Sequence, residues 1–216
     1  MNLTFSEKFI AEAMAVLDEI DPDQIEAVAR GLAMVRGAGG RLFVLGVGGS
    51  AAHAGHAVND FRKICNFEAY APTDNVSELT ARINDDGWES AFANWLIGSR
   101  LAAQDGILVL SVGGGDPDRY VSVNLIRAIE LCKEIGASIL GIVGRDGGYT
   151  AQSADACVVI PPVFVERVAA HTEGLCAVVL HLLVSHPILR AQPTHWELVA
   201  AMKATTDANR LPRLIP

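Results

Sequence analysis

A short apolar run that ends in three glycines and a serine constrains this chain more than any other feature. Residues 41–46 read Arg-Leu-Phe-Val-Leu-Gly, and Val-Gly-Gly-Ser follows before an alanine-rich stretch. This pattern predicts a buried parallel strand, a tight turn, and a helix over 50–65 with Ser50 as its N-cap. Unpaired backbone N–H groups and the helix dipole meet at such a turn, so we expect it to bind an anion such as phosphate.

The helix expected after this turn carries two histidines and an aspartate. His53, His56 and Asp60 occupy positions i, i+3 and i+7, so all three share one helix face. Side chains of these types bind metal ions or transfer protons, which places such chemistry beside the turn. The turn alone is a weak signal, because it has neither the Gly-x-Gly-x-x-Gly spacing of dinucleotide folds nor the Gly-Lys-Ser/Thr ending of nucleotide loops.

Composition narrows the class of protein. A length of 216 residues with 50% hydrophobic side chains fits one well-buried domain. The net charge of −8 and the lack of a basic cluster argue against nucleic-acid binding. The N-terminus lacks a secretory pattern, no uninterrupted apolar run approaches the ~18 residues of a membrane helix, and the four cysteines form no Cys-x-x-Cys pair. We therefore expect a cytoplasmic protein with no nucleic-acid or membrane partner.

Strand and helix patterns alternate along the rest of the chain. Further strands are expected at 67–71, 107–112, 137–143 and 156–160, and helices at 6–36 with a break at Asp21-Pro22-Asp23, at 73–83, 88–103, 118–135, 166–185 and 194–205. Residues 84–87 read as a polar turn. The alternation predicts a three-layer α/β/α fold with a five-stranded parallel sheet. Because ligands bind at the carboxyl ends of parallel strands, the glycine turns after the first and third strands should share a pocket.

We expect a single domain over 1–216. It comprises an N-terminal helical hairpin at 1–38, an α/β core at 39–190 and a C-terminal helix and tail at 191–216. A helical hairpin before such a core usually packs on the core or on a partner subunit.

Four short motifs follow one another in order. They are Gly46-Val47-Gly48-Gly49-Ser50, Ser77-Glu78-Leu79-Thr80-Ala81 with Asn84-Asp85, Ser111 with its glycine turn, and Gly144-Arg145-Asp146-Gly147-Gly148. Together they resemble the sugar isomerase (SIS) domain, and within it the phosphoheptose isomerases, over about residues 5–186. The resemblance implies a flavodoxin-like fold and a homotetramer with active sites at subunit interfaces. It also implies interconversion of sedoheptulose 7-phosphate and a heptose 7-phosphate.

The resemblance further implies one zinc, or another divalent metal, in each active site. The two histidines, the glutamate and the glutamine that hold it in the family fall on His56, Asp60, Glu173 and His181. All four side chains can bind a divalent metal. Asp60, Glu173 and His181 are carried over as catalytic groups. An enediol mechanism needs a base, an acid and an oxyanion stabiliser, so we expect the metal to polarise substrate oxygens while one ligand, His53 or Asp85 acts as base.

Substrate contacts are carried over from the same motifs onto Gly48, Gly49, Ser50, Ser77, Asp85, Ser111, Gly113 and Gly114. The chain departs from the family pattern at three points. Asp60 is one methylene shorter than glutamate, and Glu173 replaces an amide with a charge. The loop that usually reads Ser-Thr-Ser-Gly-Asn-Ser is here Ser-Val-Gly-Gly-Gly-Asp at 111–116. Asp116 would repel a phosphate, although glycine N–H groups compensate in part.

Two alternatives remain open. The altered loop favours a non-catalytic SIS protein that binds sugar phosphates or serves assembly, whereas the four metal-capable side chains oppose it. The second alternative is an SIS isomerase or lyase that acts on a different sugar, with Asp116 hydrogen-bonded to a hydroxyl group of that sugar. Eight helical residues span ~12 Å, so Glu173 and His181 share a metal only if the helix start frays or a second chain contributes. His53 and His171 fit a core role as well as a functional one.

Overall fold

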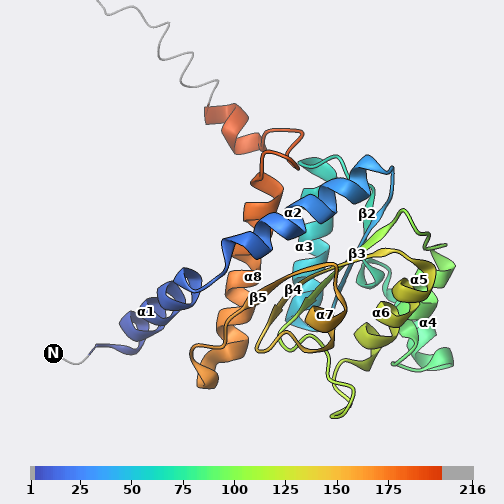
Figure 1. Cartoon of the computed structure of the whole chain (residues 1–216), viewed down its shortest axis with the longest axis horizontal. Helices are drawn as coiled ribbons and strands as arrows, with labels where there is room; N and C mark the ends of the chain where they lie inside the picture. Colours follow the sequence, from blue (N-terminus) through green and yellow to red (C-terminus); the bar gives the residue numbers. More distant parts are fainter. Residues whose placement is uncertain (1–2, 201–216) are drawn as a thin grey trace, which may run out of the picture.

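A computed structural model of the chain describes residues 3–200 (Figure 1). Five parallel strands form one sheet in the order β2-β1-β3-β4-β5. They are β1 (Leu42–Gly46), β2 (Ala69–Tyr70), β3 (Gly106–Ser111), β4 (Ser138–Gly144) and β5 (Ala156–Ile160). This is the flavodoxin order, so the predicted fold class is confirmed. Strands β1, β3 and β4 are buried almost throughout, which is why their sequences are continuous apolar runs.

Helices cover both faces of the sheet. On one face α2 (Pro22–Gly37), α3 (Gly49–Lys63) and α8 (Val168–Ser185) enclose the larger core. On the other face α5 (Ala91–Gly98) and α6 (Val123–Ile135) enclose a second core. Ile107 and Leu108 are neighbours in β3 and enter opposite cores, because successive strand side chains point to opposite faces.

α8 is long and apolar enough to cross a membrane by length and composition alone. In this fold it lies against α3 and the sheet, and residues from His171 to Val184 are buried on one side of it. Its high content of apolar side chains is therefore explained by a place in the core.

Several helix boundaries differ from the predictions. α4 (Val76–Asp86) continues through the segment that was predicted to be a polar turn. α5 is shorter than predicted, because Arg100 adopts a left-handed backbone, with φ of +55°, just beyond its end. The short α7 (Gly148–Ser153) was missed, since six residues are too few to show helical periodicity.

α6 begins at Val123 and not near residue 118. Asp116 and Val121 exchange two backbone hydrogen bonds of 2.9 and 3.0 Å, which close the residues between them into a loop. The helix predicted over 194–205 extends beyond the described residues.

The two N-terminal helices form on either side of the predicted break. Asp21 caps α2, because its side chain accepts the Asp23 N–H at 2.9 Å and Pro22 occupies the first turn. α1 (Phe5–Asp18) extends away from the sheet and contacts α8 (Figure 1).

A partly buried ion pair connects α1 to the start of α8. The Glu12 carboxylate accepts two hydrogen bonds of 2.6 Å from Arg167 and lies 3.1 Å from His171 Nε2. Hydrogen bonding to Arg167 lowers the pKa of Glu12 to about 2. His171 is only 3% exposed, so its role here is structural.

We predict that Glu12→Gln loosens α1 from α8. The pKa of Glu12 is depressed in the folded state, so its ionised form stabilises the fold above the ordinary value of 4.5, and this contribution is lost as the pH falls towards 2. The difference in thermal midpoint between wild type and Glu12→Gln should be largest at neutral pH and should disappear by about pH 2. Asp18→Asn, on an exposed part of the same helix, serves as the control and should match the wild type. A difference in thermal midpoint between wild type and Glu12→Gln that stays constant across this pH range would contradict the proposed role of the ionised Glu12 carboxylate.

Candidate functional site

The turn between β1 and α3 depends on glycine. A Cβ at Gly46 would lie 2.3 Å from the Ser50 carbonyl oxygen, and Gly48 has a φ of +62°. α3 begins at Gly49 with Gly48 as its N-cap, and no side chain caps it. Ser50 is therefore not the predicted N-cap. It lies inside the first turn of α3 and is 7% exposed.

A cavity of about 270 Å³ lies at the carboxyl ends of β1, β3 and β4. Its lining consists of Val47, Ser50, Ser111, Val112, Gly113, Val121, Ser122, Arg145 and Glu173. In a sheet of this order the ligand crevice opens between β1 and β3, where the direction of winding reverses. The structure therefore brings the predicted residues Ser50, Ser111, Gly113 and Glu173 to the expected place. Arg145 was not predicted as a site residue, although its position at the end of a predicted strand was the available signal.

The glycine turn after β3 is fixed by its own hydrogen bonds. Ser111 Oγ accepts the Gly114 N–H at 3.0 Å. The Gly114 carbonyl accepts from the N–H and the hydroxyl of Thr150, at 2.9 and 2.7 Å. A Cβ at Gly114 would lie 1.9 Å from the Gly147 carbonyl oxygen, so the turns after β3 and β4 are in contact. The Gly114 amide, which was predicted to hold substrate, is used inside the turn.

His56, Asp60 and His181 form a second group on adjoining sides of α3 and α8. The two histidine Nε2 atoms are 3.2 Å apart. Asp60 Oδ2 lies 3.1 Å from His56 Nε2 and 3.8 Å from His181 Nε2. Ligand atoms about 2.0–2.1 Å from a tetrahedral zinc are about 3.3 Å from one another. This triangle of donor atoms therefore has the size of one face of a zinc site and leaves a fourth position open.

Hydrogen bonds orient the ligand atoms of this triangle. His181 Nδ1 lies 2.9 Å from the Ala177 carbonyl oxygen. A carbonyl oxygen only accepts, so Nδ1 carries the proton and Nε2 of the neutral ring presents its lone pair to the triangle. The second carboxylate oxygen of Asp60 accepts from the Asn59 amide at 2.9 Å. The side chains of His56 and His181 are 53% and 57% exposed, so the triangle is open on the surface of the protomer.

Glu173 does not join the triangle. A Cβ at Gly49 would lie 2.6 Å from Glu173 Oε1, so this carboxylate sits on the β1–α3 turn at the cavity. His181 is eight residues further along α8, about 12 Å away along the helix axis. Three of the four predicted metal ligands are thus together, and the fourth belongs to the cavity.

The remaining predicted residues lie elsewhere. Ser77 and Asp85 are exposed on α4, a helix with no buried residue, and line neither the cavity nor the triangle. Gly48 shapes the turn without lining the cavity. His53 Nδ1 is buried and has no hydrogen-bond partner within the described part of the chain.

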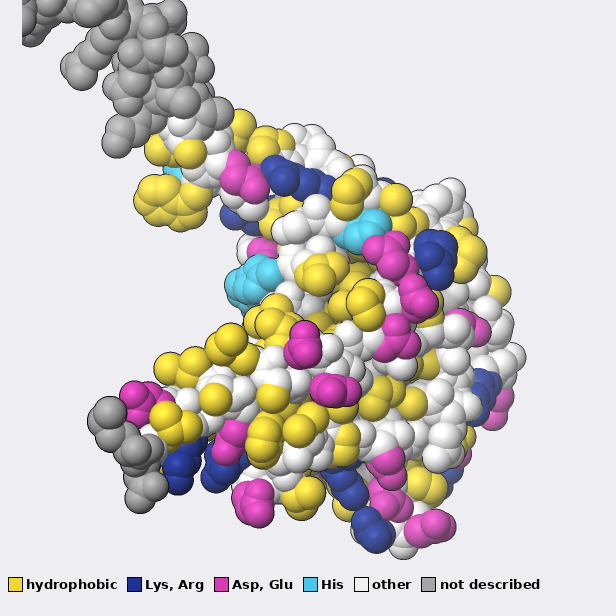
Figure 2. Space-filling model, turned by 60° about the vertical axis from the view of Figure 1, so that its left-hand side comes forward, with side chains coloured by type: hydrophobic (Ala, Val, Ile, Leu, Met, Phe, Trp, Pro, Cys, Tyr) yellow, Lys and Arg dark blue, Asp and Glu magenta, His cyan; other side chains and the backbone are white. Residues whose placement is uncertain are grey.

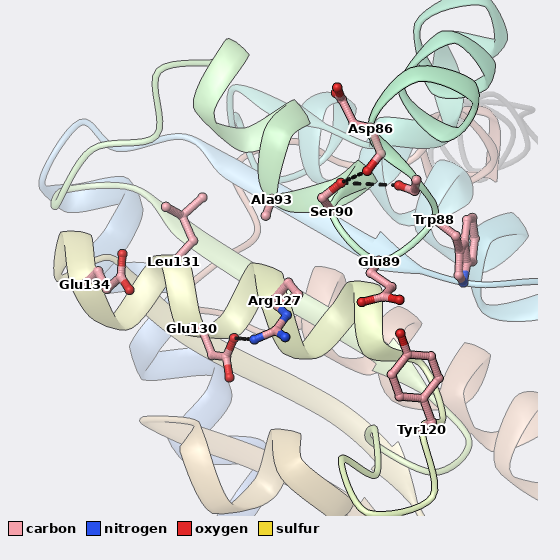
Figure 3. A pocket seen from close by; sticks show the side chains of 11 residues that line it. Asp86, Trp88, Glu89, Ser90, Ala93, Tyr120, Arg127, Glu130, Leu131 and Glu134 are labelled. Atoms are coloured by element: carbon pink, nitrogen blue, oxygen red, sulfur yellow. Dashed lines mark hydrogen bonds and ion pairs between the residues drawn. The ribbon is translucent and has the colours of Figure 1, made fainter.

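A larger cavity, about 660 Å³, is at a different place. It lies between the α4–α5 connection and α6, and Figure 3 shows Asp86 and Glu89 on the connection and Glu130 and Glu134 on the helix. Asp86, Glu89, Glu130 and Glu134 line it, and its one cation, Arg127, is held by Glu130 at 2.8 Å. Such a lining repels anions, so the cavity at the β1–β3 crevice is the better candidate for a phosphorylated ligand.

Comparison with known proteins identifies the family, although no family model matches the chain. It is 34% identical over 146 residues to a probable phosphoheptose isomerase of Thermoplasma volcanium, covering 65% of this chain and 71% of that protein. It is 30% identical over 189 residues to the phosphoheptose isomerase of Mycobacterium tuberculosis, covering 78% and 93%. The chain belongs to the phosphoheptose isomerase family. It is accordingly a member of an isomerase family, as the sequence motifs predicted.

Solved structures of the family share the fold. The chain superposes on a phosphoheptose isomerase from Francisella tularensis with a TM-score of 0.72 at 21% identity, covering 87% of this chain and 98% of that one. The corresponding values for the enzyme from Neisseria gonorrhoeae are 0.70 and 24%, with 84% and 97% covered.

We predict different outcomes for alanine at two glycines of the β1–α3 turn. At Gly46 a Cβ meets backbone atoms of Ser50, which cannot move, so Gly46→Ala should destabilise the protein by about 1–3 kcal/mol or more. At Gly49 it meets only the end of the flexible Glu173 side chain, and the gain in helix propensity of up to ~1 kcal/mol offsets the contact. Urea unfolding measures both variants. Equal losses of stability would contradict this description of the turn.

Proposed function

We propose that this chain is an aldose–ketose isomerase that converts sedoheptulose 7-phosphate into a heptose 7-phosphate through an enediol. The observation that carries the proposal is the triangle of His56, Asp60 and His181 in a chain of this family. The named activity of the relatives supports the choice of a phosphorylated sugar as substrate.

We propose that the triangle holds one zinc, or another divalent metal, in each active site. The donor set of two imidazoles and a carboxylate suits zinc, and three protein ligands with an open fourth position are typical of catalytic sites. When bound, the metal polarises the carbonyl and hydroxyl oxygens of the substrate.

Glu173 is the proposed base. Its carboxylate lines the cavity together with the hydroxyl groups of Ser50 and Ser111, and it is not engaged in the triangle. A carboxylate in this position can take a proton from the carbon beside the carbonyl and return it to the adjacent carbon. The serine hydroxyls would orient the sugar by hydrogen bonds.

We propose that a second copy of the chain completes the site in a homotetramer. The triangle and Glu173 are separated by about two helical turns of α8, so substrate bound between them requires groups from another chain. α8 exposes Val178 (44%) and Leu182 (42%) beside His181, and α1 exposes Phe5 (70%) and Met14 (67%). Figure 2 shows apolar side chains gathered along the protruding N-terminal helix. Apolar surface of this kind indicates a protein interface.

α4 carries the two predicted substrate-binding residues that we propose for the active site of a neighbouring subunit. It buries none of its residues within the protomer and carries Ser77 and Asp85, which would face the substrate of the partner in the proposed assembly. A cytoplasmic location remains a prediction.

The altered loop at 111–116 is the observation that favours the alternatives. A sugar-phosphate-binding or assembly protein without activity would bind the same ligand and leave it unchanged. An isomerase for another sugar would convert a different substrate.

Isomerase activity and metal content, measured on the same preparation, test the proposal. Protein purified without chelator should contain about one zinc per chain and isomerise sedoheptulose 7-phosphate. His181→Ala should lose the metal and at least about 100-fold in activity. The control is His186→Ala, because His186 ends α8 in an ion pair with Glu26 at 3.1 Å, away from the triangle, and should retain both. Removing the metal with EDTA should abolish activity, and zinc should restore it.

Absence of turnover by the zinc-loaded wild type would contradict the proposal. Binding without conversion would then support the non-catalytic alternative, and turnover of another sugar phosphate would support the different substrate.

A further inference from the structure

We infer that Arg145 binds the anionic end of the substrate and replaces the hydroxyl donors that the 111–116 loop lacks. The inference rests on the proposed function, because it assigns the phosphate-binding side chain of that same site. It is carried by the position of Arg145, its lack of a protein partner, and the charge of its surroundings.

Arg145 follows β4 at the carboxyl edge of the sheet. It lines the 270 Å³ cavity and also a smaller cavity of about 200 Å³ on the other side of the glycine turn. A Cβ at Gly113 would lie 3.5 Å from Arg145 Nη1, so the guanidinium lies over this turn. Glycine at 113 places no side chain between the guanidinium and the cavity.

The guanidinium is available for a ligand. Within residues 3–200 it makes no hydrogen bond or ion pair to protein, and its side chain is the only cation that lines the 270 Å³ cavity. Arg119, the other arginine near this turn, is 3.7 Å from Asp116 and lines neither cavity. A guanidinium offers paired N–H donors that match two oxygens of a phosphate.

Asp116, Asp118 and Asp146 line the 200 Å³ cavity together with Arg145, and none of them lines the 270 Å³ cavity. The Asp116 carboxylate is engaged by its own loop. Its Oδ1 accepts the N–H groups of Asp118 and Arg119 at 3.1 and 3.0 Å, and its Oδ2 faces the Arg119 guanidinium. The repulsion of phosphate that the sequence suggested is thus reduced by local pairing.

The cavity has opposite charges on its two sides. The Glu173 carboxylate lies by Gly49 on the β1–α3 turn, whereas the Arg145 guanidinium lies over Gly113 on the turn after β3. The hydroxyl groups of Ser50, Ser111 and Ser122 line the space between. This arrangement fits a polyol that carries a phosphate at one end and its reacting carbons at the other.

The backbone at this edge is held in an uncommon conformation. Arg145 has a φ of +56°, and Ser122 in the same lining has +52°. A Cβ at Gly144 would lie 2.3 Å from Thr172 Oγ1, so the end of β4 is pressed against α8 and the chain turns sharply at the next residue. Left-handed non-glycine residues concentrate at ligand sites, where the surrounding structure maintains the strain.

Inorganic phosphate and sedoheptulose 7-phosphate are the probes of this inference, used on the full chain. Arg145→Gln keeps a side chain of similar length on the same strained backbone and removes the charge. It should weaken binding of inorganic phosphate, followed by titration in phosphorus NMR, by about 10- to 100-fold. It should raise KM for the sugar phosphate by a similar factor and change kcat much less. Arg145→Lys should lose less, and Arg30→Gln, at an exposed position on α2 away from both cavities, should behave as the wild type.

Equal phosphate binding by wild type and Arg145→Gln, or no phosphate binding by the wild type, would overturn the inference. An equal loss in Arg30→Gln would also overturn it, because the effect would then reflect net charge. The two proposals fail separately. If phosphate binding depends on Arg145 but the protein shows no turnover, the anion site is supported and the isomerase proposal is contradicted. If the protein turns over substrate and Arg145→Gln leaves turnover unchanged, the isomerase is supported and the anion site is contradicted.

Discussion

The close approach of α8 to the β1–α3 turn is the contact on which the rest of the site depends. Gly46 and Gly48 let the chain leave the sheet and enter α3 within three residues, and Gly49 leaves room for the Glu173 carboxylate. A side chain at Gly46 would meet the backbone of Ser50 and displace the start of α3, the helix that packs against α8. That packing in turn brings His56 and Asp60 on one helix to His181 on the other. One backbone constraint thus positions both the cavity and the triangle.

The polar groups divide into two sets with different chemistry. The triangle offers lone pairs on the surface of two helices, and the cavity offers a carboxylate, hydroxyl groups and a guanidinium at the sheet edge. Neither set alone performs an aldose–ketose isomerisation, which requires polarised oxygens and a base at one carbon pair. Their separation along α8 is the physical reason to look for a second chain between them.

Much of this organisation was predictable from the sequence. β1, β3 and β4 are continuous apolar runs that lead into glycine turns, so the fold class and the shared edge of the turns followed directly. Spacing also located His56 and Asp60 on one helix. The eight-residue interval also indicated that Glu173 and His181 share a metal only if the helix start frays or a second chain contributes. Which of the two lies beside His56 and Asp60 depends on how α8 is seated on α3, and the sequence does not show that. The helix was predicted to begin at residue 118 and not at 123, since the loop closed by the Asp116–Val121 bridge leaves no periodic signal. Arg145 was overlooked because its importance lies in the lack of a protein partner, which only three-dimensional contacts reveal.

The most direct test of the account is anomalous diffraction at the zinc absorption edge from crystals grown with zinc and sedoheptulose 7-phosphate. The account predicts a zinc peak about 2.0–2.2 Å from His56 Nε2, His181 Nε2 and an Asp60 oxygen. A peak at a different set of side chains, or no peak in crystals that contain bound sugar phosphate, would contradict it.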